Sequence, residues 1–349
     1  MKDVPFGPNS RRKSKYAARA VPDEKRATSA MIASLDAEGR DTIAAPFGEA
    51  LCALASQRDD IVGLSADLSK YTDLHVFAAK YPDRFYQMGM AEQVLISAAA
   101  GLAREGFTPW ATTYAVFASR RAYDFICMAI AEENLPVKIA CALPGLTTGY
   151  GPSHQATEDL AIFRGMPNLT IVDPCDALET MQATHALSAT PGPAYMRLLR
   201  GKVPNVLGEY GYEFKLGRAK LIHDGADVLF ISSGFMTMRT IDAAKALKDD
   251  GIDCAVLHVP TIKPLDEATI RAEAARTGRL IVTAENHTII GGLGEAVGAS
   301  LMRAGVQARF RQIALPDEFL DAGALPTLHD QYGLSVPRIT AQVKEWLDE

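Results

Sequence analysis

One carboxyl group stands where it would have little water around it: Glu92, in the sequence Gly89–Gln93. It follows an apolar stretch typical of a strand, Arg84–Met88, and opens a segment, Val94–Ala103, that is apolar on nearly every face of a helix. Burial disfavours the charged form of a carboxyl group, so Glu92 could act as a proton donor near neutral pH. A carboxylate at a helix start is also favourable simply because the helix dipole is positive there.

Two further segments carry side chains that could serve the same site. The first, Thr113–Asp124, holds Tyr114 and Phe117 three residues apart. The second, Gly151–Ala161, holds His154 after a Gly-Pro-Ser turn. Taken alone, an aromatic pair indicates core packing, and an isolated histidine in a turn is as often a surface residue. The specific signal is the order and spacing of the three segments.

In that order and spacing the segments resemble the second half of transketolase and, almost as well, the related deoxyxylulose-phosphate synthase. The resemblance runs from about Thr42 to the C-terminus. It implies thiamine diphosphate as cofactor, which is activated when a carboxyl group bonds the far nitrogen of its aminopyrimidine ring. By this resemblance Glu92 supplies the carboxyl group, and Phe117 and Tyr114 stack on the pyrimidine. Such a stack contributes about 0.5–1.5 kcal/mol beyond burial.

The same resemblance assigns three more residues near the cofactor. His154 is expected to face the substrate's hydroxyl or carbonyl group, where an imidazole can move a proton or donate a hydrogen bond. Asp67 matches an aspartate near the cofactor, although in Ser65–Leu68 it could equally be a turn or helix-capping residue. Arg121 is expected to contact the cofactor. We therefore predict Glu92 and His154 as the catalytic residues.

The diphosphate-binding sequence of the family, Gly-Asp-Gly followed by Asn, belongs to an earlier domain, and no Gly-Asp-Gly occurs in this chain. The resemblance therefore implies the second subunit of a split enzyme. A partner subunit would hold the diphosphate and Mg²⁺, so we expect no metal site in this chain. We expect an α₂β₂ assembly with active sites between the subunits.

Three positions at the substrate end depart from the family. An aspartate that contacts the sugar is replaced by Tyr150, four residues before His154. A phosphate-contacting histidine is replaced by Ala142, and a phosphate-gripping arginine by Ala44. Arg200 is retained and could meet an anion. We predict a ketose or 2-oxo acid as substrate, in contact with His154, Tyr150 and Arg200, and expect xylulose 5-phosphate to be a poor donor.

Several functions remain open at this level. The favoured one is transfer of a ketol or acyl unit by a transketolase-like enzyme. The alternatives within the same chemistry are a split deoxyxylulose-phosphate-synthase-like enzyme and the β subunit of a 2-oxo-acid dehydrogenase. A non-catalytic scaffold or regulatory subunit is a further alternative, but such a chain would keep Glu92, Phe117 and His154 together only by chance.

Composition excludes several other classes of protein. The 349 residues are 48% hydrophobic and 22% charged, with a net charge of −6, as in a globular protein of about two domains. No basic stripe lies in the globular part, which argues against nucleic acid, and no apolar run approaches the ~20 residues that span a bilayer. The five scattered cysteines indicate a reducing compartment, so we expect a cytoplasmic protein.

The chain divides into four regions. Residues 1–40 form a basic arm that we expect to be mobile or to contact a partner. Short β-branched strands alternate with helical patterns over 41–200, the pyrimidine-binding domain, and again over 223–349, the C-terminal domain; 201–222 is the linker. This alternation predicts an α/β protein with two domains, each a mainly parallel sheet covered by helices. In the second domain we interpret Gly291–Gly294, with Glu285 and His287, as packing rather than a phosphate site.

Overall fold

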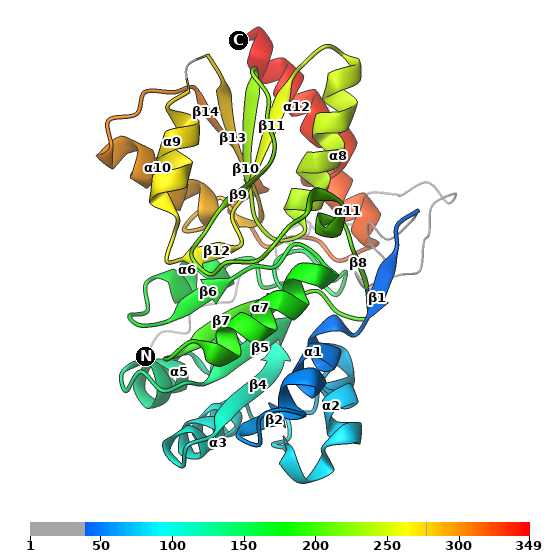
Figure 1. Ribbon diagram of the computed structural model, residues 1–349. Coiled ribbons are helices and arrows are strands. Elements are labelled where there is room, and N and C mark those ends of the chain that lie inside the picture. Colours follow the sequence, from blue (N-terminus) through cyan, green and yellow to red (C-terminus); the bar gives the residue numbers. More distant parts are fainter. Residues whose placement is uncertain (1–38, 277) are drawn as a thin grey trace, which may run out of the picture.

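The computed structural model describes residues 39–276 and 278–349, so nearly all of the predicted N-terminal arm lies outside the described residues. The described chain forms two sheets rich in parallel strands and covered by helices, one in each half of the molecule (Figure 1). A separate antiparallel pair joins β1 (Thr42–Ala44) to β8 (Lys202–Pro204). The expected α/β class with two mainly parallel sheets is confirmed.

The first sheet has seven strands, whose central members are buried along their whole length and parallel to one another. Burial on both faces explains their short, apolar sequences. In spatial order the strands are β12 (Thr261–Lys263), β6 (Thr170–Val172), β7 (Ala194–Leu198), β5 (Lys138–Ala142), β4 (Thr108–Tyr114), β2 (Ile61–Ser65) and β3 (Phe85–Gln87). The accompanying helices are α1 (Pro46–Ala55), α2 (His75–Lys80), α3 (Glu92–Arg104), α4 (Ala115–Arg121), α5 (Tyr123–Ile126), α6 (Asp159–Arg164) and α7 (Ala177–Ala189).

The second sheet has five strands and forms the other half of the molecule in Figure 1. In spatial order they are β14 (Phe310–Leu315), β13 (Leu280–Thr288), β10 (Val228–Ser232), β11 (Cys254–His258) and the antiparallel edge strand β9 (Lys220–His223). The helices of this half are α8 (Met236–Asp249), α9 (Glu267–Ala274), α10 (Leu293–Arg303), α11 (Leu325–Gln331) and α12 (Val336–Asp348). Of all the helices described, none is long and apolar enough to cross a bilayer.

The glycine-rich turn before α10 is closed by a side chain of its own domain. The Glu285 carboxylate accepts hydrogen bonds from the backbone N–H groups of Leu293 (2.6 Å) and Gly294 (2.8 Å). A Cβ atom on Gly292 would lie 2.0 Å from Glu285 Oε2, so a larger residue there would displace the Glu285 side chain. Burial raises the pKa of Glu285 to about 7. The Glu285 side chain thus occupies the start of α10, which is the kind of contact that the packing interpretation of Gly291–Gly294 expects.

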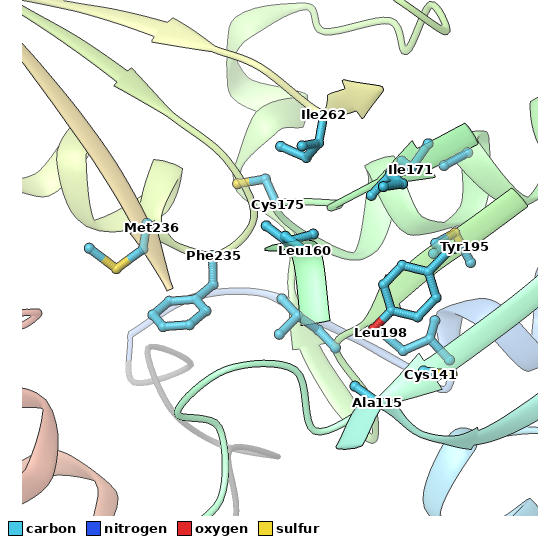
Figure 2. Packing of buried hydrophobic residues seen from close by; sticks show 14 of the residues in the cluster. Ala115, Cys141, Leu160, Ile171, Cys175, Tyr195, Leu198, Phe235, Met236 and Ile262 are labelled. Carbon is cyan, nitrogen blue, oxygen red and sulfur yellow. The ribbon is translucent and has the colours of Figure 1, made fainter. Parts of the chain in front are cut away.

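The two halves share a sheet. Strand β12 comes from the second half of the chain but pairs antiparallel with β6 at the edge of the first sheet. The backbone N–H of Asp173 also donates to Pro260 O over 2.8 Å. Figure 2 shows Ile262 of β12 beside Ile171 and Cys175 in the buried cluster. This strand crossing was not predicted from the sequence.

A buried polar network reinforces the same junction. Arg197, in β7, donates from Nε to Asp159 Oδ2 over 2.9 Å and from Nη2 to Oδ1. Its Nη1 donates to Asn286 O (3.2 Å) in the second half of the chain. The Ser233 hydroxyl, also in the second half, donates to Asp173 Oδ2 in the first half (2.9 Å). Burial alone would raise the pKa of Asp159, but the Arg197 guanidinium holds it below its usual range. A buried charge pair is tolerated because each partner makes several hydrogen bonds.

Removing one hydroxyl group from this network should destabilise the fold. The Tyr195 hydroxyl donates to Asp159 Oδ2 over 2.6 Å, and both side chains are fully buried. Tyr195→Phe is expected to lower the free energy of unfolding by about 1–3 kcal/mol, measured by chemical denaturation. Tyr81→Phe is the matched control, because its hydroxyl donates to Cys52 O at 3.3 Å from a partly exposed position. Equal losses in the two variants would contradict this account.

Candidate active site at the edge of the first sheet

The candidate site lies at the carboxyl ends of β2 and β4. These strands are neighbours, but the chain leaves β2 for β3 on one side before returning to β4 on the other. Ligands of open parallel sheets bind in the crevice outside the strand ends at such a switch point. Asp67 follows β2 and Tyr114 ends β4. The topology therefore directs the predicted residues of two separate segments to the same sheet edge; the region around Asp67, Glu92, Tyr114, Phe117 and His154 is called the crevice.

Glu92 is the first residue of α3 and is only 4% exposed, as its apolar surroundings in the sequence predict. Its carboxylate has two long contacts: Thr113 Oγ1 donates to Oε1 over 3.3 Å, and Arg121 Nη1 donates to Oε2 over 3.4 Å. Normal hydrogen bonds to a carboxylate are shorter, near 2.7–2.9 Å. The carboxylate is thus shielded from water and only weakly hydrogen-bonded. Thr113 was not predicted, although it directly precedes Tyr114.

Four of the predicted side chains meet as an aromatic cluster. The ring centroids of Tyr114 and Phe117 are 5.7 Å apart, and the His154 ring lies edge-on to them at 6.1 Å and 5.6 Å. The Tyr150 ring, half exposed, lies edge-on to His154 at 5.4 Å. Edge-to-face contacts at these distances are favourable and hold the rings in fixed relative orientations. Two segments that are some thirty residues apart therefore form one surface.

The loop that carries His154 is fixed from two sides. Arg120 donates to Pro152 O (2.9 Å) and Gln155 O (3.3 Å) and forms an ion pair with Glu158, which ties α4 to the loop. Gln155 Nε2 donates to Asp321 O (3.1 Å) of the second half of the chain. The His154 Nδ1 atom is 2.9 Å from the Ser153 hydroxyl. Arg120 was not predicted; its position beside Arg121 gave no sign of which arginine would support the loop.

Asp67 occupies a turn at the edge of the crevice. Its φ is +61°, a left-handed conformation that aspartate tolerates better than most residues. Its backbone N–H donates to Gln87 Oε1 over 2.7 Å, and the same oxygen accepts from the Gly89 N–H at 3.3 Å. Gln87 thus joins the turn after β2 to the sequence that leads into Glu92. The Asp67 side chain is exposed, and its predicted contact with a cofactor stays a prediction.

Arg200, which the sequence predicts as a substrate contact, lies beside residues from the turn after β2. The Arg200 guanidinium lies 5.5 Å from the centroid of the Tyr71 ring. Asp73 accepts the N–H of Gly201, the residue after Arg200, with both carboxylate oxygens (3.0 and 3.1 Å). Burial raises the pKa of Asp73 to about 6. Burial also raises the pKa of Tyr114. Tyr71 and Asp73 were not predicted, because only the fold brings them to Arg200.

The two alanines at the positions that the sequence comparison with the family predicts to be phosphate contacts offer no polar side chain. Ala142 ends β5 and is fully buried, and Ala44 ends the short strand β1. Over residues 39–276 and 278–349, no three His, Cys, Asp or Glu side chains gather where they could hold a metal ion.

Comparison with known proteins identifies the family. The model of the transketolase pyrimidine-binding domain matches residues 41–205, and that of the transketolase C-terminal domain matches residues 217–339. A putative uncharacterized transketolase family protein of Sinorhizobium fredii is 72% identical over 323 residues, which are 92% of this chain and 94% of the relative. The chain belongs to the transketolase family.

Other members of the transketolase family have nearly the same extent as this chain. A putative transketolase C-terminal section of Methanocaldococcus jannaschii is 35% identical over 86% of this chain and 94% of its own length. The 6-deoxy-6-sulfo-D-fructose transketolase subunit of Clostridium sp. is 35% identical over 88% and 93%. A solved structure described as a split-gene transketolase in an inactive β₄ tetramer is 37% identical, with a TM-score of 0.78 over 87% and 97%. The predicted resemblance to a C-terminal-section subunit is confirmed.

Transketolase-family enzymes use thiamine diphosphate, and the residues present in the crevice fit its pyrimidine end. Glu92 offers a buried carboxylate without a strong partner, which suits a ring nitrogen as hydrogen-bond partner. Phe117 is half buried, contacts the same Arg121 side chain as Glu92 and offers an aromatic surface for a flat ring. Glu92 begins α3 and Phe117 lies in α4, so both side chains are carried by helices rather than by a long loop.

Proposed function

We propose that the chain is the second subunit of a split transketolase-like enzyme that transfers a ketol or acyl unit. The observation that carries the proposal is the meeting of Glu92, Phe117 and His154 at one crevice of a transketolase-family fold. A partner subunit holds the diphosphate and Mg²⁺, since the Gly-Asp-Gly sequence is absent here. The solved split-gene relative is described as an inactive β₄ tetramer, which supports this division.

Each residue then has a definite task. When bound, thiamine diphosphate supplies the nucleophilic carbon for the transfer. Glu92 holds or releases a proton at a carboxylate oxygen, while Phe117 and Tyr114 orient the flat ring against it. His154 uses Nδ1 towards Ser153, so Nε2 is the nitrogen that meets a substrate oxygen, where it moves a proton or donates a hydrogen bond. Tyr150 and Arg200 contact the remainder of the substrate.

The assembly is an α₂β₂ tetramer with its active sites between unlike subunits. Its substrates are a ketose or a 2-oxo acid. All five cysteines are free thiols, which supports a reducing compartment such as the cytoplasm. Decarboxylation of pyruvate, as in a deoxyxylulose-phosphate-synthase-like enzyme, is the competing activity, so pyruvate is one of the donors to be assayed.

The purified chain alone is expected to bind thiamine diphosphate weakly and to show no turnover. Binding should be measured by titration calorimetry with and without Mg²⁺, and turnover with a panel of donors and an aldehyde acceptor. Adding a subunit that carries Gly-Asp-Gly and Asn should restore both, because the diphosphate and metal contacts come from that subunit. Tight, Mg²⁺-dependent binding to this chain alone would overturn the split site. Full assembly without turnover on any donor would favour a scaffold.

A further inference from the structure

The side chain of Arg121 makes two contacts in the crevice that a stacked pyrimidine would need. The guanidinium carbon lies 4.0 Å from the centroid of the Phe117 ring, directly over its face. Its Nη1 atom lies 3.4 Å from Glu92 Oε2. One face of the candidate stacking residue and one oxygen of the candidate proton-transfer residue are therefore engaged by the same side chain.

A guanidinium and an aminopyrimidine are similar in the properties that matter here. Both are flat and delocalised, and both present N–H donors in their own plane. Stacked carbon atoms approach to about 3.5–4.0 Å, so a guanidinium at this height fills the layer against the Phe117 face. Two flat groups cannot occupy that layer at once. A ring that stacks on this face and bonds Glu92 must displace Arg121.

We infer that Arg121 is an internal substitute for the pyrimidine: in the chain without cofactor it covers Phe117 and pairs with Glu92, and it swings away when cofactor enters. The inference rests on the proposed function. The movement concerns Arg121 alone. The neighbouring Arg120 is held by Glu158 and by two backbone carbonyl groups and does not need to move.

The position of Arg121 allows this movement. It is the last residue of α4, and its side chain is 53% exposed, so rotation about its flexible stem can carry the guanidinium into solvent. While it stays in place it gives a partner to Glu92, a carboxylate that is almost completely buried. Arg121 therefore stabilises the cofactor-free chain and competes with the cofactor. Removing its side chain should lower the stability of the cofactor-free chain and raise its affinity for the cofactor.

The test uses the complex with the diphosphate-binding partner and Mg²⁺. Arg121→Ala is expected to tighten thiamine diphosphate binding about two- to fivefold by calorimetry, the equivalent of one exposed cation–π contact. The same variant should lower the melting temperature of the cofactor-free complex. Arg104→Ala is the matched control, because Arg104 is 54% exposed and pairs with Glu133 away from the crevice. It should leave the dissociation constant unchanged.

Each outcome decides between distinct readings. Weaker binding in Arg121→Ala would overturn the inference and make Arg121 a direct cofactor contact, as the sequence resemblance suggested. Unchanged binding would also overturn it, because the guanidinium would then lie outside the pyrimidine position. If the wild-type complex binds no thiamine diphosphate, the proposed function fails and the inference fails with it. Tightening in Arg121→Ala but not in Arg104→Ala supports it.

Discussion

Replacing Glu92 by Gln in the assembled enzyme is expected to lower kcat at least about a hundredfold, within the range attributed to a positioned acid–base group. The amide has the same shape as the carboxyl group, and its oxygen can still accept from Thr113 Oγ1. What it loses is the ability to hold and release a proton at the ring nitrogen. Hydrogen–deuterium exchange at the thiazolium carbon, followed by NMR, measures that step without depending on the donor.

The control for Glu92→Gln is Glu133→Gln. Glu133 is an exposed carboxylate paired with Arg104, so its amide variant tests the effect of removing one negative charge from the chain. Both variants should retain the wild-type circular dichroism spectrum, and Glu133→Gln should retain wild-type exchange. If Glu92→Gln also exchanged at the wild-type rate, Glu92 would have no part in activating the cofactor.

Donor specificity should differ clearly from that of enzymes that grip a sugar phosphate. Charge-assisted hydrogen bonds to phosphate contribute roughly 1.5–3 kcal/mol each, and Ala44 and Ala142 provide none. Ala142 is fully buried, so no small movement brings a donor there. We expect xylulose 5-phosphate to have a lower kcat/KM than at least one unphosphorylated ketose or 2-oxo acid. The panel should include pyruvate and a sulfonated ketose, because one relative is named for 6-deoxy-6-sulfo-D-fructose.

Substitutions at Tyr150 test the structural basis of this specificity. Tyr150 is 51% exposed and contacts His154 edge-on, so replacements there should fold. Tyr150→Asp restores the family residue and should raise kcat/KM for polyol donors relative to 2-oxo acids, whereas Tyr150→Phe removes only the hydroxyl group. A kcat/KM for xylulose 5-phosphate a hundredfold above every unphosphorylated donor, about 2.7 kcal/mol, would contradict our interpretation of positions 44, 142 and 150.

The sequence predicted the parts of the site that depend on local order along the chain. Glu92 opens its helix in dry surroundings, and Tyr114, Phe117 and His154 meet, because parallel strands place successive loops at one edge of the sheet. The two-sheet α/β class followed from the alternation of short apolar strands and helices.

The unpredicted residues depend on contacts between distant segments. Thr113, Gln87 and Arg120 hold the site residues through side-chain hydrogen bonds that no periodicity reveals. Tyr71 reaches Arg200 only because the turn after β2 lies beside the end of β7 in the folded chain. Arg121 could be assigned to the crevice by resemblance, but its position over Phe117 rather than beside it is a matter of rotamer and so lies beyond sequence patterns.

The strand crossing at the junction bears on how a gene for this chain could divide. Cutting the chain in the predicted linker, 201–222, would remove β12 and leave β6 as a bare edge, without its partner strand or the carbonyl of Pro260 that Asp173 contacts. An unpaired edge readily joins the edge of another molecule and aggregates. Although the chain reads as two domains, its halves are therefore expected to be inherited and expressed as a single unit, and fission within the linker should be disfavoured during evolution.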